Sequence, residues 1–391
     1  MQKLRTGVIG IGNMGSAHAS CIAGGQIDGL ELTAVCDIKK EKLNAFKEMH
    51  GDIKTYTDYN LLIASGEVDA VVIAVPHPLH SKIAIKALEC GLHVMLEKPV
   101  DISVSNAQRL NEVAQKTDRV FAIMFNQRTN PLFIKAKEIM DSGALGALKR
   151  TVWIVTNWYR TQNYYDSGEW RATWSGEGGG VLLNQAPHNL DLWQWICGMP
   201  ESVVAFCDIA KYHNIEVEDD VTIITRYKNG AVGTFITSTG EYPGTNRLEI
   251  SGDLGKIVLE DGILKWWRLK QPEPEVRITS KKNFQKIEYD YWELKQLEPE
   301  PAHKGMLQNF ANAILKGEKL IAPGTDGIFE LTISNAAYIS NFNGHKEVKI
   351  PFNTDEFDEL LAKLAANSSG SKTSGNSQLS GEYSQRWQVN W

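Results

Sequence analysis

Residues 7–18 read GVIGIGNMGSAH and carry the spacing G-x-G-x-x-G at Gly10, Gly12 and Gly15. An apolar strand pattern precedes them, and a helix pattern follows over 13–23. The first glycine allows a tight turn, the second lets a pyrophosphate approach backbone N–H groups at the helix N-terminus, and the third lets helix and strand pack closely. The spacing also occurs in chance glycine turns, but its place between a strand and a helix predicts a dinucleotide site.

The residue that follows the second strand pattern indicates which dinucleotide binds. ELTAVCD ends at Asp37, 22 residues after Gly15. A carboxylate at this position accepts hydrogen bonds from both ribose hydroxyls and repels a 2′-phosphate. Lys39 and Lys40 follow closely and offer an alternative partner for a phosphate. The sequence therefore predicts NAD, with a preference over NADP that these lysines moderate.

Short Val- and Ile-rich runs alternate with helix-length segments over residues 4–124. TGVIG, LTAVCD, DAVVIAV, HVMLEK and VFAIMF have the length of strands, and 80–90 and 104–116 have the length of helices. Such alternation predicts a parallel sheet covered by helices on both faces. We expect a doubly wound α/β domain of the Rossmann type over residues 1–126.

The pattern changes at about residue 147 to strand-like runs joined by short turns such as KNGA, with one helix near 187–197. This indicates an α+β domain with a large, mostly antiparallel open sheet over 127–365. Residues 271–301 are rich in Pro, Glu and Lys and are predicted to form an exposed excursion, followed by helices near 304–316 and 326–341. Residues 366–391 combine a flexible polar linker with YSQRWQVNW, whose aromatic residues predict a docking tail.

The composition excludes several classes of protein. The chain has 391 residues and a net charge of −6, so it lacks the basic footprint of a protein that binds nucleic acid or an anionic membrane. It has no apolar run of membrane length, and MQKLRTGVIG leaves no room for a signal peptide. Its five cysteines are scattered without metal-ligand spacing, which predicts reduced thiols, no metal site and a cytoplasmic location.

The fifth strand pattern ends in VMLEKPV, which places Glu97 and Lys98 at the carboxyl edge of the sheet, where such folds bind ligands. A lysine there can share a hydroxyl proton and stabilise negative charge on the oxygen. Its position alone fits a surface lysine equally well. Pro99 restricts Lys98 to extended geometry.

A second candidate group lies in LLNQAPHNLDLWQW, residues 182–195. Asn184 and His188 are four residues apart and point the same way on a helical turn, whereas the stretch from Leu190 onward has the pattern of apolar core. An imidazole is a suitable base for a hydroxyl proton, although an isolated histidine is more often structural. Asn184 also fits an N-cap for a helix that Pro187 begins.

Several ordered motifs resemble one family: GVIGIGNMG, VVIAVPHPLHSKIAIKALECGLHVMLEKP, FNQRTNP, SGALGALK and GEGGGVLLNQAPHNLDLWQWICG. Over residues 3–350 the chain is similar to the glucose–fructose oxidoreductase/inositol dehydrogenase/MocA (Gfo/Idh/MocA) family. The resemblance implies a Rossmann domain, a second domain with a large open sheet, and hydride transfer between a nicotinamide cofactor and a secondary alcohol of a sugar or cyclitol. It also implies that Lys98 is the catalytic lysine, Pro99 a cis-proline and His188 the proton acceptor. The family's usual aspartate is Asn184 here, which can only donate and accept hydrogen bonds.

The remaining candidates follow from the resemblance and from residue type. Cofactor contacts are predicted for Gly10, Gly12, Asn13, Met14, Gly15, Asp37, Ala74, Pro76, His77, His80, Glu97, Lys98, Asn126, Gln127, Arg128, Trp170 and Arg171. Substrate contacts are predicted for Asn184, Tyr164, Arg160, Trp174 and His303.

Alternative interpretations of these residues remain open. The aromatic segment WYRTQNYYDSGEWRATW, residues 158–174, suits the C–H faces of sugars but also suits a loop packed for oligomerisation. His303 also fits a docked surface histidine. His77 and His80 could be a metal pair but lack a third ligand. GEGGG lacks the strand and the Lys-Ser/Thr of a phosphate loop, which favours close backbone packing.

The leading hypothesis is an NAD-dependent oxidoreductase that acts on a secondary hydroxyl of a sugar or glycoside, with C3 of a glucoside as the finer assignment. The aromatic segment, Asn184 and the RWQVNW ending resemble the branch of the family that oxidises glucosides at a ring hydroxyl. The alternatives are an NAD-dependent glycosidase or lyase that oxidises its sugar transiently, an inositol dehydrogenase, and a non-catalytic NAD sensor, against which Lys98 and His188 argue. The expected partners are a sugar, glycoside or cyclitol and further copies of the chain, in a homo-oligomer formed through the C-terminal sheet and tail.

Overall fold

The computed structural model describes residues 3–296 and 300–368, which form two compact units. Unit 1 holds the described residues up to Thr129 together with Gly176–Gly178 and Pro301–Leu331. Unit 2 holds Asn130–Ser175, Gly179–Glu300 and the described residues from Thr332 onward. The domain boundaries expected at 126 and 365 stay predictions, and residues 369–391 of the expected tail lie outside the described residues.

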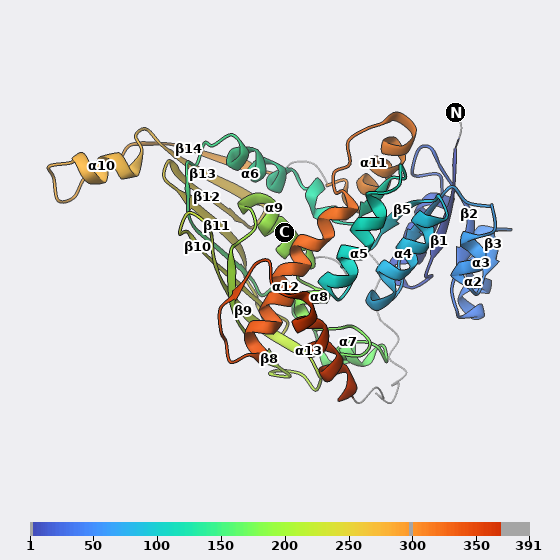
Figure 1. The fold of residues 1–391 in the computed structure, drawn as a ribbon. Coiled ribbons are helices and arrows are strands. Elements are labelled where there is room, and N and C mark those ends of the chain that lie inside the picture. The colour runs from blue at the N-terminus through green and yellow to red at the C-terminus, as the bar shows by residue number, and fades with distance from the viewer. Residues whose placement is uncertain (1–2, 297–299, 369–391) are drawn as a thin grey trace. The chain divides into compact units, whose positions relative to one another are not determined.

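Unit 1 is built on a six-stranded sheet of order β3-β2-β1-β4-β5-β6, in which all neighbours are parallel (Figure 1). Its strands are β1 Leu4–Ile9, β2 Leu30–Cys36, β3 Lys54–Tyr56, β4 Ala70–Ile73, β5 His93–Leu96 and β6 Phe121–Ile123. Its helices are α1 Asn13–Ala23, α2 Lys40–His50, α3 Tyr59–Ile63, α4 His80–Glu89, α5 Val104–Ala114 and α11 Ala302–Lys316, with short turns η1 His77–Leu79, η2 Asn126–Thr129 and η3 Gly324–Asp326.

The predicted doubly wound fold is therefore confirmed. The strands of β4 and β5 read as unbroken apolar runs because both faces of a parallel sheet are covered, and Val71, Val72 and Ile73 are fully buried. The short strand β3 escaped the sequence pattern because its three residues are exposed or half-buried. The order of strands reverses between β1 and β4, and ligands of such sheets bind at the carboxyl ends of the strands at this reversal.

Unit 2 is built on a nine-stranded sheet of order β14-β13-β12-β11-β7-β10-β9-β8-β15. Its strands are β7 Leu148–Val155, β8 Ser202–Ile209, β9 Glu218–Arg226, β10 Val232–Ser238, β11 Asn246–Gly252, β12 Gly255–Glu260, β13 Ile263–Leu269, β14 Tyr289–Lys295 and β15 Val348–Lys349. Its helices are α6 Pro131–Asp141, α7 Gln162–Asp166, α8 Val181–Asn184, α9 Pro187–Cys197, α10 Glu273–Thr279 and α13 Thr354–Ala366, and α12 Gly327–Phe342 contributes from Thr332 onward. The sheet is antiparallel except where β7 and β10 pair in parallel, which confirms the predicted mostly antiparallel architecture.

One face of this sheet carries the core of unit 2. Phe235 stacks on Trp193 of α9 at 5.6 Å between ring centroids, and Trp153 meets Phe133 of α6 at 5.8 Å. Residues alternate between the two faces of a strand, so Val204, Phe206, Ile224 and Ile236 point to the other face, where they are half-buried or exposed. The helices α6 and α9 therefore cover the inner face, and an apolar surface remains on the other.

Two parts of this unit contain elements that the sequence analysis did not predict. The segment 271–301, predicted as an exposed excursion, is mostly exposed in its described residues, and it contains α10 and also β14, which extends the sheet by pairing with β13. The strand was not predicted because five of its seven residues are exposed, so it does not carry the apolar pattern of a buried strand. The helix α13, capped by the Asn353 side chain on the N–H of Asp355, was not anticipated.

Candidate functional site

The glycine-rich turn has the geometry that its spacing predicts. Gly10 has a φ of +94°, and a Cβ there would lie 2.3 Å from the carbonyl oxygen of Ala74, which follows β4. A Cβ at Gly15 would lie 1.7 Å from the carbonyl oxygen of Gly10, so only glycine lets α1 approach the turn. A Cβ at Gly12 would meet nothing within 4 Å, so the N-terminus of α1 is open to a ligand.

Asp37 follows β2 and reaches the same turn. Its Oδ2 accepts a hydrogen bond from the N–H of Ile11 at 2.9 Å, and its Oδ1 accepts one from the N–H of Lys39 at 2.9 Å. Lys42 Nζ lies 3.4 Å from Oδ2. The phosphate contact that Lys39 or Lys40 could make stays a prediction. The carboxylate is held beside the glycine-rich turn, where the ribose of a dinucleotide would bind.

Replacing Asp37 by alanine is expected to reduce discrimination between NADH and NADPH by at least about 100-fold, because a charged acceptor for two hydroxyls is lost along with a repulsive charge. Fluorescence titration with both cofactors measures this without any substrate. The ratio of the two dissociation constants is the readout, because the loss of the bond to Ile11 affects both cofactors alike. Asp52→Ala, at an exposed carboxylate of the same unit, should leave the ratio unchanged. An unchanged ratio in Asp37→Ala would refute the assignment.

Lys98 directly follows a buried carboxylate at the end of β5. From Val94 to Asp101 every residue is buried except Lys98, which is half-exposed. Glu97 Oε1 lies 2.7 Å from His18 Nε2, and Glu97 Oε2 accepts a hydrogen bond from the Lys98 N–H at 3.2 Å. The peptide bond between Lys98 and Pro99 is cis, as the resemblance implies. The Glu97 side chain thus holds the backbone at Lys98.

Two histidines surround Glu97. Burial opposes ionisation of Glu97, but the hydrogen bond from His18, with the nearby His303 and Lys98, lowers its pKa to about 2. His303, at the start of α11, has its ring 5.8 Å from that of His18. Burial lowers the pKa of His303 to about 4, against the opposing effect of Glu97, so this ring is neutral at pH 7. His303 is therefore a polar, uncharged neighbour of the Glu97–Lys98 turn.

His80 links the two loops at this edge of the sheet. Its Nδ1 lies 2.6 Å from the carbonyl oxygen of Pro99 and its Nε2 lies 2.8 Å from that of Val75. Burial lowers the pKa of His80. The side chain therefore holds the Lys98–Pro99 turn against the loop that carries Ala74 and Pro76. His77 is buried beside it, with ring centroids 5.8 Å apart, and a direct cofactor contact of either histidine stays a prediction.

Asn126, Gln127 and Arg128 form most of η2, directly after β6, and all three are buried. Arg128 Nη1 lies 2.7 Å from Asp326 Oδ2 of η3, so its charge is neutralised within unit 1. Asn126 Oδ1 is buried and has no hydrogen-bond partner among the residues that the structure describes. An unsatisfied buried acceptor at the carboxyl end of a strand is what a bound ligand would complete.

In unit 2, Asn184 and His188 stand out from their surroundings. From Glu177 to Gln194 every residue is buried except these two, which are half-exposed. Asn184 ends α8 and His188 is the second residue of α9. The alternative role of Asn184 as a helix cap is wrong: Ala186 precedes α9 and no side chain caps it. Asn184 does not cap α9 because it is the last residue of a separate short helix, α8, which ends before Pro187.

A buried carboxylate anchors the start of α8. Glu218 of β9 is fully buried, and its oxygens accept hydrogen bonds from the N–H of Gly180 at 2.9 and 3.0 Å, the N–H of Leu182 at 3.0 Å and the hydroxyl of Tyr338 at 2.8 Å. A Cβ at Gly180 would lie 2.0 Å from the carbonyl oxygen of Glu218. The close backbone packing predicted for the GEGGG segment is therefore seen at this glycine. Burial raises the pKa of Glu218 to about 7, although these donors favour the ionised form.

Glu218→Gln is expected to change how stability depends on pH. The folded-state pKa of about 7 lies above the ordinary 4.5, so between these values the folded protein keeps a proton that the unfolded chain releases. The stabilising contribution is present below pH 4.5 and is lost as pH rises through about 7, with a change on the order of 2–3 kcal/mol between pH 5 and 8. Urea unfolding of both proteins at these pH values measures it, with Glu241→Gln as the exposed control. A difference between variant and wild type that does not vary with pH would contradict the assignment.

Tyr164 organises the polar side chains around Asn184. Its hydroxyl donates to Asn184 Oδ1 at 3.4 Å and accepts from Arg171 Nη1 at 2.8 Å and Gln185 Nε2 at 3.3 Å. The guanidinium groups of Arg160 and Arg171 lie 5.1 and 4.6 Å from the centre of its ring. Gln185 Oε1 is buried and has no hydrogen-bond partner among the described residues. These amide, hydroxyl and guanidinium groups suit a ligand rich in hydroxyls.

The structure therefore brings together Glu97, Lys98 and His303 in unit 1, and Tyr164, Arg160, Arg171 and Asn184 in unit 2. Trp170 joins the second group through Arg171, whose guanidinium lies 4.7 Å from its ring. Trp174 does not: it is buried and packs edge-on against Tyr338 and Phe342 at 5.5 and 5.8 Å. Its predicted substrate contact stays a prediction.

Three residues that support these groups, His18, Gln185 and Glu218, were not among the site residues predicted from the sequence. His18 could have been found, because it falls on the buried face of α1 with Gly15, Ala19 and Ile22, where a polar residue needs a partner. Gln185 and Glu218 carried no such signal. No helix in the described part of the chain is long and apolar enough to cross a membrane, and no group of three or more potential metal ligands occurs there.

Both units match domains of one enzyme family. Residues 4–125 match the oxidoreductase family NAD-binding Rossmann fold, and residues 133–258 match the GFO/IDH/MocA C-terminal domain. The chain belongs to the Gfo/Idh/MocA family. It is an NAD-dependent oxidoreductase that acts on CH–OH groups. The open glycine turn at Gly12 and the unsatisfied Asn126 Oδ1 fit this cofactor.

Relatives within the Gfo/Idh/MocA family span between 66% and 90% of this chain. The myo-inositol 2-dehydrogenase of Thermotoga maritima is 27% identical over 85% of this chain and 95% of its own length. The levoglucosan dehydrogenase of Pseudarthrobacter phenanthrenivorans is 27% identical over 66% of this chain and 74% of its own. The WlbA dehydrogenase of Bordetella pertussis, solved with NADH and UDP-GlcNAcA, is 26% identical and superposes with a TM-score of 0.74 over 90% of this chain and all of its own.

Proposed function

We propose that this oxidoreductase moves a hydride between NAD and a secondary hydroxyl of a sugar or glycoside, with C3 of a glucoside as the position oxidised. The observation that carries the proposal is the exposure pattern of residues 177–194, in which only Asn184 and His188 are not buried. Asn184 is joined by Tyr164 and Gln185, which supply hydroxyl and amide groups for substrate hydroxyls. The relatives named above, which act on inositol and levoglucosan, support a polyhydroxylated substrate.

We assign the handling of the substrate's hydroxyl proton to Lys98 and His188. The glycine-rich turn and Asp37 would hold NAD, which would supply the hydride acceptor for the carbinol carbon. His188 takes the hydroxyl proton as a neutral imidazole, and Lys98 donates hydrogen bonds to the oxygen as negative charge develops on it. Asn184 cannot take a proton, so it orients a neighbouring hydroxyl. Glu97 holds the backbone at Lys98, and Glu218 holds the start of α8 before Asn184.

Incubation with NAD⁺ and a panel of cyclitols, free sugars and glucosides tests the proposal, with NADH read by absorbance and products by mass. A glucoside product lighter by two hydrogens, formed with stoichiometric NADH, is the expected result. Turnover of cyclitols alone would replace the proposal by an inositol dehydrogenase. Release of free sugar without net NADH would replace it by a glycosidase or lyase that oxidises the sugar transiently.

We further propose that the chain forms a homo-oligomer through the sheet of unit 2. The face opposite α6 and α9 presents Val204, Phe206, Ile224 and Ile236, of which Phe206 is 45% exposed. Exposed and half-buried apolar residues grouped on one face of a sheet are typical of protein interfaces. Light scattering measures the mass in solution, and a monomer at micromolar concentration would exclude the assembly.

A further inference from the structure

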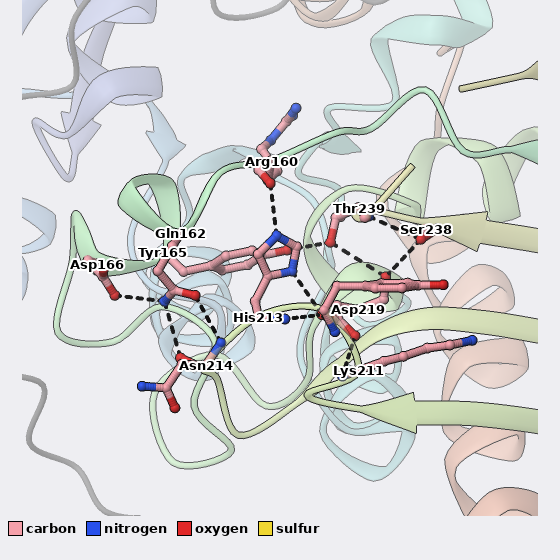
Figure 2. A network of polar contacts seen from close by, with 12 residues as sticks. Arg160, Gln162, Tyr165, Asp166, Lys211, His213, Asn214, Asp219, Ser238 and Thr239 are labelled. Atoms are coloured by element: carbon pink, nitrogen blue, oxygen red, sulfur yellow. Dashed lines mark hydrogen bonds and ion pairs between the residues drawn. The ribbon is translucent and has the colours of Figure 1, made fainter. Parts of the chain in front are cut away.

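A polar network in unit 2 joins the aromatic segment to other parts of the unit, and the backbone of Arg160 is its only contribution from a predicted substrate residue (Figure 2). It joins three parts of the chain: residues 158–166, which include α7, the turn 211–214, and the neighbouring ends of β9 and β10. Every residue in it is described by the structure and belongs to the same unit. Its two central residues, His213 and Asp219, have no role in the function proposed so far.

Asp219 organises the turn. Its side chain is fully buried, and it accepts hydrogen bonds from the N–H groups of Lys211, Tyr212 and His213 at 2.9, 2.9 and 3.0 Å. A fourth contact joins its Oδ2 to His213 Nδ1 at 2.8 Å. The turn therefore wraps around one carboxylate, which places the His213 ring in a single orientation (Figure 2).

The other ring nitrogen of His213 reaches the aromatic segment. Its Nε2 lies 2.8 Å from the carbonyl oxygen of Arg160. A carboxylate and a carbonyl oxygen only accept hydrogen bonds, so the ring lies between two acceptors and bridges the turn and the aromatic segment.

The backbone of Arg160 is consequently held at two points. Its N–H donates to the carbonyl oxygen of Thr239 at 2.9 Å, and its own carbonyl accepts from His213. Tyr165 supports the arrangement, since its hydroxyl lies 2.7 Å from Thr239 Oγ1 and its ring centre lies 4.8 Å from that of His213. The N–H of Asn214 donates to Gln162 Oε1 at 2.9 Å, which ties the turn to α7 a second time.

The held segment leads directly to the candidate substrate residues. The Arg160 guanidinium lies 5.6 Å from the Trp158 ring and 5.1 Å from the Tyr164 ring. The Tyr164 hydroxyl in turn contacts Asn184. A displacement of the Arg160 backbone would therefore move the side chains that are proposed to bind the sugar.

We propose that His213 and Asp219 form a latch that positions the segment 158–166 for substrate binding, through the hydrogen bond from His213 to the Arg160 carbonyl. They are positioning residues, because they touch the segment and not the substrate. The inference rests on the proposed function of Arg160 and Tyr164. It predicts that the latch affects the binding of the sugar and leaves cofactor binding and the chemical step unchanged.

His213→Phe tests the latch because it keeps a ring against Tyr165 and removes both ring nitrogens, while three backbone N–H groups still satisfy Asp219. We expect KM for the sugar to rise by about tenfold or more, with kcat and the dissociation constant of NADH within about twofold, as the loss of one buried hydrogen bond would give. Hydrogen exchange of a peptide that covers 159–166 should quicken by a similar factor. His213→Gln keeps one donor and should fall between the variant and wild type.

Lys211→Ala is the matched control, because it lies in the same turn, keeps its backbone N–H to Asp219, and loses side-chain contacts to Asp208, Asp220 and the Tyr212 ring. It should match wild type in KM and in exchange. If His213→Phe lowers thermal stability but leaves both KM and exchange at 159–166 unchanged, the pair is structural and the latch is refuted. If wild type oxidises no sugar, the proposed function fails; accelerated exchange in His213→Phe would then still support the latch, and unchanged exchange would refute it.

Discussion

Lys98→Met is expected to lower kcat by about 10²- to 10⁴-fold, the range over which a positioned proton-handling group accelerates a reaction. The variant keeps the length of the side chain and removes its charge and its donors. Glu97 would still hold the backbone through the N–H of residue 98, so the turn should persist. NADH should bind within about threefold of wild type, because the glycine turn and Asp37 are untouched. Steady-state kinetics on the best substrate of the panel, with NADH titration, measure both quantities.

Two further variants sharpen the test of Lys98. Lys98→Arg keeps the positive charge but cannot give up a proton at working pH, so recovery of most activity would mean that the lysine acts by charge alone. Lys82→Met, at an exposed position of α4, should behave as wild type. Full activity in Lys98→Met would remove the lysine from the mechanism.

His188→Gln is expected to reduce kcat by about 10²- to 10³-fold, because glutamine can hold a hydroxyl by a hydrogen bond but cannot take its proton. Hydroxide can partly replace a missing base, so the residual rate should climb with pH over a range in which the wild-type rate is flat. Rates measured from pH 6 to 10 reveal this difference. A merely structural histidine would instead lower stability without altering the pH profile.

The control for His188 is His345→Gln, which changes an exposed histidine of unit 2 whose ring stacks on Phe206. This variant should retain wild-type kcat at every pH. Equal losses in the two variants would show that the effect of His188→Gln comes from altered packing.

Local patterns predicted unit 1 well because its signals lie within short stretches of chain. The helix expected over 13–23 is α1, Asn13–Ala23, and Asp37 does reach the glycine-rich turn. A tight turn, a helix start and a strand end each depend on neighbouring residues, so periodicity and glycine spacing suffice to find them. The short strand β3 lacked such a pattern and was found only in the structure.

The polar contacts that hold the candidate site were not predictable in the same way. His18 meets Glu97 across 79 residues, Tyr338 meets Glu218 across 120, and His213 meets Arg160 across 53. A buried polar residue interrupts the apolar pattern of its element, but the sequence does not indicate which distant group will be its hydrogen-bond partner. The capping role of Asn184 was wrong for a related reason, since the short helix α8 ends at Asn184 and a separate helix, α9, begins at Pro187.

The sequence by itself determined the doubly wound unit, the NAD site at its glycine-rich turn, and Lys98 and His188 as the residues to examine. Only the tertiary structure showed that Glu97 is paired with His18, that Glu218 anchors the helix of Asn184, and that His213 holds the backbone of Arg160. The physical reason is range: turns and amphipathic helices are set by residues a few positions apart, whereas a buried hydrogen bond depends on which distant donors and acceptors the completed fold brings within 3 Å of each other.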